Sequence, residues 1–256
     1  MVFNGDDYLD AALKGIYDIA HEIIIVEGAV KEFMFAANPD GSSTDKTVEI
    51  INSFPDPLQK IRFIQGKWDN KMHMQNVIAE HVTGDIYLKL DSDEFYHINE
   101  LEWLLNLYRE DKNLWIIRYK FNHFWHSKDH IAVDSQWESR MNRICRWRKD
   151  FRHSLTDPRG FNYFVDSKGV RVDAPTYKVL ELDDRLVYHF AYVKPKRKVQ
   201  EKLKYYSTRG IGEEVKDTWS DWKDGMPTQP THGGGTVTQF NGVLPKAVIN
   251  HPLLRK

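Results

Sequence analysis

Two closely spaced carboxylates, Asp91 and Asp93, follow the apolar segment 86–90, which has the composition of a buried strand. In an open parallel sheet, ligands bind beyond the carboxyl ends of the strands, so these side chains are expected beside a ligand. Two carboxylates that flank a small Ser92 can share a hard cation such as Mg²⁺ or Mn²⁺, which prefers oxygen ligands and also takes substrate phosphates. Because this tripeptide pattern is common, a solvated acidic turn is the alternative interpretation.

The segments that must position this pair alternate between helical and extended patterns. Residues 6–19 carry apolar side chains at helical spacing, and residues 22–27 contain a β-branched run. The same order follows twice more, with helices expected at 47–54 and 71–81 and strands expected at 61–64 and 86–90. This alternation predicts an α/β fold with a mostly parallel central sheet flanked by helices.

The second half of the chain has a different pattern. Beyond a helix expected at 99–109, aromatic strands such as 114–121 give way to irregular stretches around 127–135. This half predicts an α+β elaboration with a basic helix at 194–206, and the segment 225–235, rich in Gly, Pro and Thr, predicts a mobile loop.

Length and composition predict one compact domain over residues 1–256. Its start, Met1-Val2-Phe3, is short for the first strand of an open sheet, because such strands usually have about 5 residues or more. We therefore allow for residues upstream of Met1.

The charge balance excludes some partners. The chain has 36 Lys and Arg against 37 Asp and Glu, and a net charge of −1 gives no long-range field to collect nucleic acid. The single Cys145 has no partner for a disulfide or a zinc site, which fits a reducing compartment, and we expect a cytoplasmic protein. No apolar run approaches the roughly 20 residues that span a bilayer. The basic run 194–198 leaves a peripheral contact with anionic lipid open, although a solvated helix start is the simpler interpretation.

Several motifs occur in a fixed order along the first half of the chain. They are Asn4-Gly5-Asp6-Asp7-Tyr8-Leu9, Glu22-Ile23-Ile24-Ile25-Val26-Glu27-Gly28, Asp40-Gly41-Ser42-Ser43-Thr44-Asp45-Lys46-Thr47, Asn76, Gly84-Asp85 and Leu90-Asp91-Ser92-Asp93-Glu94. Their order resembles the opening of family 2 glycosyltransferases with the Rossmann-like GT-A fold. Tyr188-His189-Phe190, followed by a basic helix, is similar to later parts of some members.

This resemblance implies a function and a division of labour. It implies a nucleotide-sugar-binding half at about 1–98 and an acceptor-side half at about 99–256. It also implies transfer of a sugar from a nucleotide-sugar donor, a UDP-sugar by family habit, to a hydroxyl of a glycan or glycolipid, with inversion at the anomeric carbon. The donor sugar and the acceptor depend on pocket shape and are not specified by these motifs.

The resemblance also assigns contacts to the donor. It places Phe3, Asn4 and Glu27 around the base and ribose, where a carboxylate accepts hydrogen bonds from uracil N–H or ribose hydroxyl groups. A solvent-facing strand end is the alternative for Glu27, and Gly28-Ala29 follows it where the family commonly has Gly-Ser. Diphosphate contacts are expected from Lys71 and Asn76, with Lys67 competing for that role. Either lysine is alternatively an ordinary solvated side chain.

For the metal, the resemblance makes Asp93 the direct ligand of Mn²⁺ or Mg²⁺, and Asp91 contacts the ribose or binds the ion through water. His189 follows an extended segment and is a further candidate ligand, since a neutral imidazole suits Mn²⁺. A structural histidine is the alternative.

An inverting transfer needs a carboxylate base that takes the proton from the acceptor hydroxyl. We nominate Glu138, which is flanked by Trp137 for stacking on a sugar and by Arg140 and Arg143 for binding phosphate or holding the carboxylate ionised. A surface salt bridge is the alternative for Glu138. Further candidates are Asp134, Glu181, Asp183 and, beside the metal pair, Glu94.

Two other functions remain open at this stage. A nucleotidyltransferase also places carboxylates and a divalent ion at the end of a parallel sheet, although no glycine-rich nucleotide loop occurs near Met1 and no P-loop motif occurs in the sequence. A catalytically silent protein that binds a nucleotide or a carbohydrate would retain the same fold.

Overall fold

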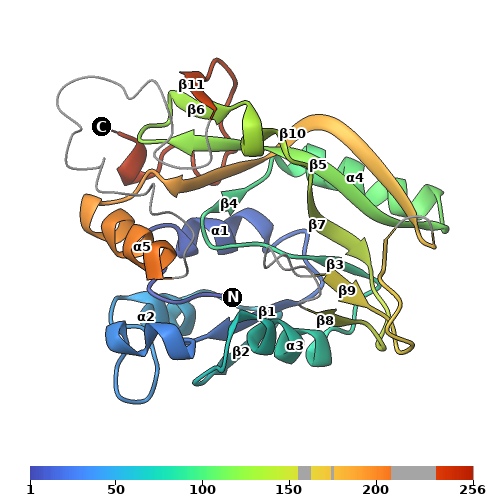
Figure 1. Cartoon of the computed structure of the whole chain (residues 1–256), viewed down its shortest axis with the longest axis horizontal. Helices are drawn as coiled ribbons and strands as arrows, with labels where there is room; N and C mark the ends of the chain where they lie inside the picture. Colours follow the sequence, from blue (N-terminus) through green and yellow to red (C-terminus); the bar gives the residue numbers. More distant parts are fainter. Residues whose placement is uncertain (155–162, 174–175, 209–234, 256) are drawn as a thin grey trace. The chain divides into compact units, whose positions relative to one another are not determined.

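The computed structural model describes residues 1–154, 163–173, 176–208 and 235–255 (Figure 1). The chain divides into two compact units, each assembled from three segments. Unit 1 comprises Met1–Ser92, Ile98–Arg118 and Asn142–Glu181, and unit 2 comprises Asp93–His97, Tyr119–Met141 and Leu182–Lys256. The expected loop 225–235 lies outside the described residues except for Gly235. The single domain expected over 1–256 stays a prediction.

Unit 1 opens with alternating helices and strands, which confirms the α/β class. The elements are α1 (Leu9–Ile16), β1 (Ile23–Glu27), the 3-10 helix η1 (Lys31–Ala36), α2 (Thr47–Ser53), β2 (Ile61–Gln65), α3 (Lys71–His81) and β3 (Ile86–Leu88). β1 and β2 pair in parallel, with Ile23 opposite Ile61 and Glu27 opposite Gln65. α3 begins and ends at the residues expected from its periodicity.

The other ladders of unit 1 are antiparallel. β3 pairs with β7 (Met141–Arg146), where Tyr87 lies opposite Cys145, and β8 (Arg152–Ser154) pairs with β9 (Tyr163–Val165). α4 (Ile98–Glu110) completes the unit. The mostly parallel central sheet expected from the sequence is not confirmed: β1 and β2 form a parallel pair, whereas the β3–β7 and β8–β9 ladders are antiparallel. β3 takes an antiparallel partner from much later in the chain, and such long-range pairing leaves no local sequence signal.

Unit 2 is built on strands in the order β11-β6-β5-β10-β4 (Figure 1). The strands are β4 (Glu94–Phe95), β5 (Leu114–Trp125), β6 (His130–Val133), β10 (Lys178–Tyr192) and β11 (Thr236–Gln239), and β5 and β10 each begin in unit 1. The helices are η2 (Ser135–Glu138), α5 (Lys196–Thr208) and η3 (Pro252–Leu254). The stretch expected to be irregular around 127–135 therefore contains β6, whose Ile131 lies opposite Phe124 of β5.

Each unit has its own apolar core. In unit 1, β1 packs between two sets of side chains: Leu9, Leu13 and Ile51 come from α1 and α2, and Met74 and Ile78 come from α3. In unit 2, the core is aromatic, and the ring centroids of Trp125 and Tyr192 lie 4.2 Å apart. Cys145 is buried in unit 1, and burial raises the pKa of its thiol, so this cysteine stays protonated and unreactive.

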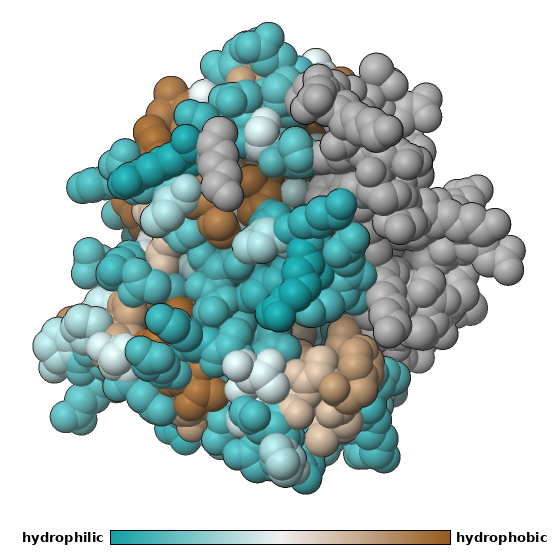
Figure 2. Space-filling view, turned by 90° about the vertical axis from the view of Figure 1, so that its left-hand side faces the viewer, coloured by the Kyte–Doolittle hydropathy of each residue, from teal (hydrophilic) through white to brown (hydrophobic). Residues whose placement is uncertain are grey.

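One face of the described part of the chain is mainly polar. Figure 2 shows one face on which hydrophilic side chains predominate and apolar ones form separate patches. Among the described helices, none combines the length and the apolar character that crossing a membrane requires.

A tight turn after β1 depends on Gly28. Its φ is +124°, a conformation that L side chains rarely adopt, and a Cβ at this position would lie 2.0 Å from the carbonyl oxygen of Gly66. Its N–H donates a hydrogen bond to the Val2 carbonyl at 3.2 Å. The turn therefore brings the start of the chain beside the end of β1.

We expect Gly28→Ala to lower the free energy of unfolding by about 1–3 kcal/mol, because the variant adds backbone strain and a clash with a carbonyl. For a chain of this size, Tm should fall by roughly 2–4 °C per kcal/mol, which differential scanning calorimetry measures. Gly84→Ala is the matched control, since a Cβ there meets its nearest atom only at 3.9 Å. Equal Tm values for the two variants would contradict this account of the turn.

His153, on β8, is a histidine enclosed by apolar rings. It is 5% exposed, and its ring centroid lies 4.4 Å from that of Phe164. Neither ring nitrogen has a hydrogen-bond partner among the described residues. Burial, with a smaller contribution from the charge of Lys89, lowers the pKa of His153 from 6.5 to about 3. The folded protein therefore holds this imidazole neutral.

This lowered pKa gives a pH dependence with a definite sign. Between pH 6.5 and about 3, the unfolded chain binds one more proton at His153 than the folded chain does, so stability falls as the pH falls. The slope from this residue approaches about 1.4 kcal/mol per pH unit. Urea unfolding at pH 7, 6 and 5 should give a flatter profile for His153→Phe than for the parent, whereas His21→Phe, at an exposed position, should follow the parent. Parallel profiles for all three proteins would rule this out.

Candidate functional site

Glu27 ends β1 as a buried carboxylate. The residue is 0% exposed, and both oxygens accept hydrogen bonds. Oε1 accepts from the backbone N–H and the hydroxyl of Ser43 at 2.8 and 2.6 Å, and Oε2 accepts from Nε2 of Gln65 at 2.8 Å. The alternative of a solvent-facing strand end is therefore wrong. Glu27 fixes the loop that contains Ser43 against the carboxyl ends of β1 and β2.

Asn4 holds the same loop from the start of the chain. It adopts a positive φ of 48°, which asparagine tolerates. Its backbone N–H donates to Ser43 Oγ at 2.8 Å, and its Oδ1 accepts from the Thr44 N–H at 2.8 Å. The half-buried Phe3 precedes it, with its ring centroid 6.0 Å from that of Phe33. The structure thus brings Asn4 and Glu27 together at one loop, and the contact of Phe3, Asn4 and Glu27 with the base and ribose stays a prediction.

The same loop contains a tight turn at Asp40. Its Oδ1 accepts hydrogen bonds from the hydroxyl and the N–H of Ser42 at 2.7 and 2.9 Å. These bonds, with a weaker contribution from the charge of Lys67, lower the pKa of Asp40. Lys67 lies against the turn, because a Cβ on Gly41 would be 2.5 Å from Lys67 Cγ. An exposed ammonium group therefore stands beside the loop held by Glu27.

The two other residues assigned to the diphosphate lie on α3. Lys71 is exposed at the first residue of the helix. Asn76 is bonded to β8, since its Oδ1 accepts from the His153 N–H at 2.8 Å and its Nδ2 donates to the His153 carbonyl at 3.3 Å. Asn76 therefore has a structural role, and its contact with diphosphate stays a prediction.

Asp91 forms an ion pair in unit 1. Its Oδ2 lies 3.0 Å from Nη2 of Arg143, a guanidinium that is only 9% exposed. The sequence placed Arg143 next to Glu138 as a phosphate contact, but the structure pairs it with Asp91. The carboxylate side chain keeps 38% of its surface exposed, so Asp91 is oriented by Arg143 without being enclosed.

Asp93 is the buried member of the acidic pair. It is 7% exposed, and its Oδ2 lies 2.7 Å from Nζ of Lys194. Its Oδ1 lies 3.7 Å from Nε2 of His189. Burial alone would raise the pKa of Asp93, but the charges of Lys194 and His189 outweigh it and hold the pKa well below its usual range. Asp93 is therefore ionised, with a cation of the protein beside it.

His189 connects Asp93 to a second histidine. Its Nδ1 lies 3.0 Å from Nδ1 of His123, so one ring donates and the other accepts. In the strand pairing, His189 lies opposite Glu94, which is 0% exposed. The other ring nitrogen of His189, Nε2, faces Asp93, the carboxylate that the resemblance makes the metal ligand.

The donor set near Asp93 suits a hard divalent cation in its chemistry. A carboxylate and a neutral imidazole are acceptable ligands for Mn²⁺, and a carboxylate suits Mg²⁺. Among the residues that the structure describes, no group of three or more His, Cys, Asp or Glu side chains is arranged around a common metal position. Nζ of Lys194 lies 2.7 Å from Oδ2 of Asp93, so a metal bound to that oxygen would compete with the ammonium group.

Glu138 lies within a cluster of cations in unit 2. It pairs with the Arg185 guanidinium, and Nζ of Lys120 lies 3.3 Å from its Oε2. Burial would raise the pKa of Glu138, but Arg185 and Lys120 together lower it. The carboxylate is ionised and is a weak base. Trp137 is buried against Trp125 and Tyr192, so the expectation that it stacks on a sugar is wrong.

The remaining base candidates are distributed over the two units. In unit 2, Asp134 is exposed, and its N–H donates to Glu138 Oε1 at 3.3 Å. Asp183 pairs with Lys120 and Arg140 in the same unit, and Glu181 belongs to unit 1, where it pairs with Arg118. Glu94 is fully buried, whereas Glu138, Asp134, Glu181 and Asp183 keep exposed surface.

Sequence reasoning missed three contributors. It did not predict that Lys194 pairs with Asp93, that Arg143 pairs with Asp91 or that His123 bonds to His189. The run 194–198 predicts a solvated helix start or a contact with anionic lipid, but not a partner for Asp93. No local signal marks these partners, because each lies far along the chain from the residue that it contacts.

Comparison with solved structures found similar chains at low sequence identity. Among solved structures, S. aureus TarS 1–349 in complex with UDP-GlcNAc is similar with 15% identity and a TM-score of 0.48, over 80% of this chain and 64% of that chain. S. aureus TarS 1–349 has 13% identity and a TM-score of 0.45, over 80% and 63%. This chain thus spans less than two thirds of those chains. No curated protein matches by sequence.

A sequence model of one family provides the assignment. The model described as glycosyl transferase family 2 matches residues 39–167, a little over half of the chain. The match includes the loop at Ser43, helix α3, the acidic pair and Glu138. The chain belongs to glycosyl transferase family 2.

Proposed function

We propose that this chain transfers a sugar from a nucleotide-sugar donor, a UDP-sugar, to a hydroxyl group of a glycan or glycolipid acceptor, with inversion. The observation that carries the proposal is Asp93, a buried carboxylate that is kept ionised two residues after Asp91 at the end of the β3 segment. Membership of family 2 supports the same reaction class. The neighbouring solved structure with UDP-GlcNAc gives the choice of UDP-sugar as the first donor to test.

The donor half of the proposal uses the loop held by Glu27. Backbone and hydroxyl groups of this loop are already fixed by Glu27 and Asn4, so it offers a preorganised surface to a nucleoside. The exposed ammonium groups of Lys67 and Lys71 supply positive charge for a diphosphate. In this proposal Phe3 contacts the base.

In this proposal, Asp93 binds Mn²⁺ or Mg²⁺, and Asp91 and His189 are further ligands. When bound, the ion neutralises negative charge on the departing diphosphate. Arg143 orients Asp91, and the bond to His123 couples the tautomers of the two rings, so that Nε2 of His189 carries no proton when its Nδ1 is the donor. Lys194 neutralises Asp93 before the metal binds, and this pair keeps a buried charge satisfied.

In this proposal, Glu138 removes the proton from the acceptor hydroxyl, and Asp134 is the alternative base. Glu138 is ionised, as a base must be, although Arg185 and Lys120 make it weak. An acceptor that displaces one of these cations would strengthen the base, because the pKa of Glu138 would rise.

One observation favours a second candidate function. Lys194 already provides a positive charge to Asp93, so a protein that binds nucleotide or carbohydrate without turnover would need no metal there. In this alternative, the Lys194 ammonium is a permanent replacement for the metal. Metal dependence of nucleotide binding separates the two candidates.

The first test is thermal stabilisation by UDP, GDP and dTDP, with and without Mn²⁺. A ligand at 100 times its Kd stabilises the folded state by about 2.7 kcal/mol, which corresponds to roughly 5–10 °C in Tm for a chain of this size. We expect the shift with UDP and Mn²⁺ together, and its loss in Asp93→Asn, which removes the charge but keeps the shape.

The matched control is Asp85→Asn, which makes the same substitution at an exposed position before β3 and should keep the shift. Release of UDP from UDP-GlcNAc and related donors then tests for turnover. If no nucleotide moves the parent Tm under any metal condition, the donor-site proposal loses its support.

The second test removes the competing cation. Lys194→Met leaves Asp93 without its ammonium partner, so Tm should fall in the absence of metal and recover when Mn²⁺ is added. Mn²⁺ should bind at least about tenfold more tightly than to the parent, which corresponds to about 1.4 kcal/mol and is measurable by titration calorimetry.

The control for this substitution is Lys196→Met, an exposed lysine two residues further on, which should bind Mn²⁺ as the parent does. Weaker nucleotide binding by Lys194→Met that Mn²⁺ does not restore would favour the silent binding protein over the enzyme.

A further inference from the structure

The loop held by Glu27 begins with a compact part, residues 29–41, which we call the aromatic loop. Its two ends meet, because the Ala29 N–H donates to the Gly41 carbonyl at 2.8 Å. Between these ends lies η1, whose sequence Lys31-Glu32-Phe33-Met34-Phe35-Ala36 contains two phenylalanines. Surface loops of this kind, with their ends close together, are packed by their own side chains and frequently carry function. The aromatic loop is such an Ω-loop, and it follows β1 directly.

Bonds to other segments of unit 1 fix both ends of η1. At its first residue, the Lys31 N–H donates to the Trp68 carbonyl at 2.9 Å, and Lys31 Nζ lies 2.6 Å from Oδ1 of Asp69. At its last residue, the Ala36 carbonyl accepts from Nδ2 of Asn4 at 3.2 Å. The aromatic loop is therefore positioned before a ligand arrives, so a ligand that contacts it does not have to order it.

Phe35 is the most exposed of three neighbouring rings. The ring centroid of Phe33 lies 6.0 Å from that of Phe3 and 6.3 Å from that of Phe35, and the planes of Phe33 and Phe35 differ by 29°. Phe3 and Phe33 are half-buried, whereas Phe35 is 71% exposed. An apolar ring in contact with water is unfavourable, and a ligand that covers it removes this cost. Phe35 thus presents a flat apolar face to solvent, with Phe33 packed beside it.

The far end of the aromatic loop lies beside a cation. A Cβ on Gly41 would be 2.5 Å from Lys67 Cγ, and Lys67 is exposed. The proposed function assigns the Lys67 ammonium group to the diphosphate of the donor. A nucleotide joins a flat base to its diphosphate through one ribose, so it requires a stacking surface and a positive charge near each other. The aromatic loop carries the first and borders the second.

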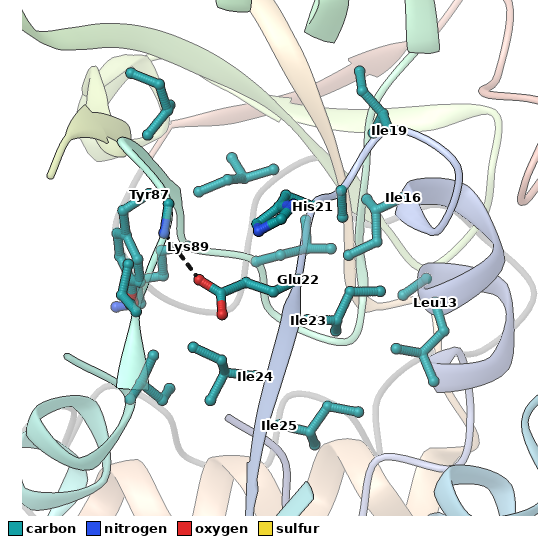
Figure 3. A pocket seen from close by; sticks show the side chains of 18 of the residues that line it. Leu13, Ile16, Ile19, His21, Glu22, Ile23, Ile24, Ile25, Tyr87 and Lys89 are labelled. Atoms are coloured by element: carbon teal, nitrogen blue, oxygen red, sulfur yellow. Dashed lines mark hydrogen bonds between the residues drawn. The ribbon is translucent and has the colours of Figure 1, made fainter. Parts of the chain in front are cut away.

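A cavity of about 630 Å³ between β1 and β3 is the other hollow of unit 1 in which a base could be considered (Figure 3). Its lining is mainly aliphatic and includes Leu13, Ile16 and Ile24, and none of residues 29–41, all of which the structure describes, lines it. A base placed among aliphatic side chains would bury its carbonyl and N–H groups without partners. On the aromatic loop, the polar edge of the base stays in water, so the loop suits a base better than the cavity does.

We propose that the nucleobase of the donor stacks on Phe35, so that the aromatic loop forms one wall of the nucleoside site. This assignment rests on the proposed function, and it adds Phe35 to Phe3 as a contact of the base. Base–aromatic stacking tolerates every base, because each base has a π face. Phe35 therefore contributes affinity for a nucleotide and leaves the choice of base to other residues.

The test changes the ring of Phe35 in the full chain. Phe35→Leu removes the π face and keeps an apolar side chain, whereas Phe35→Trp keeps an aromatic ring. In titration calorimetry with Mn²⁺ present, we expect UDP to bind about tenfold more weakly to Phe35→Leu and within about twofold of the parent to Phe35→Trp. Inorganic pyrophosphate has no base, so its affinity should be the same for the parent and both variants. Because Phe35 is exposed, the Tm without ligand should not change.

The matched control is Leu58→Ala, which changes an apolar side chain that is 67% exposed in another loop of unit 1 and should bind UDP as the parent does. If the parent binds UDP and Phe35→Leu binds it equally well, the stacking assignment is overturned and the proposed function stands. If the parent binds neither UDP nor pyrophosphate under any metal condition, the proposed function fails and the assignment fails with it.

Two further results would overturn the assignment in favour of another role. An equal loss of UDP and pyrophosphate affinity in Phe35→Leu would mean that the ring supports the shape of the loop and does not contact the base. Binding of the parent, but not of Phe35→Leu, to phosphatidylcholine vesicles, with unchanged affinity for UDP, would assign Phe35 to a lipid surface.

Discussion

A carboxylate that leaves water must receive donors or a positive charge, and this requirement determines the surroundings of Glu27 in unit 1 and of Asp93 in unit 2. Glu27 is fully buried and is satisfied by Ser43 and Gln65, so the loop must fold over the end of β1. Asp93 is nearly as buried and is satisfied by Lys194 and His189, so the segment between β10 and α5 must place an ammonium group beside it. In each case, a charge at a strand end determines where a distant segment lies. The apolar cores stabilise the strands, but these charges set the positions of the loops.

The two carboxylates are satisfied by different means, and this difference separates their roles. Glu27 receives neutral hydrogen-bond donors from its own unit, which hold it permanently and leave no reason for exchange. Asp93 is paired with cations. A divalent metal ion can therefore take the place of the Lys194 ammonium group without leaving the carboxylate unpaired. Glu27 thus suits a fixed scaffold for a nucleoside, and Asp93 suits a site whose occupant changes during a reaction cycle. Asp91 is intermediate, because Arg143 orients it while part of its surface stays open.

The sequence predicted the local features well and the distant pairings poorly. Periodicity located α3 to the residue and β1 and β2 within one residue, since those signals are carried by neighbouring side chains. The same reasoning found only part of β10, because Glu181, Asp183 and Asp184 do not read as strand residues until their cationic partners are known. Arg118, Lys120 and Arg140 supply the charges for two of them and come from other parts of the chain. For the site, the acidic pair and the Ser43 loop were visible as motifs. The burial of Glu27 and the partners Lys194 and Arg143 were not, since they arise only when separate elements meet.

The start of the chain and the donor loop are coupled through a short series of bonds in unit 1. Val2 bonds to Val26 and Gly28 at the end of β1, and Asn4 follows two residues later. Asn4 bonds to Ser43 and Thr44, and Ser43 bonds to Glu27 at the end of the same strand. A nucleoside that orders the loop would therefore also order the start of the chain, because coupling between two sites is reciprocal.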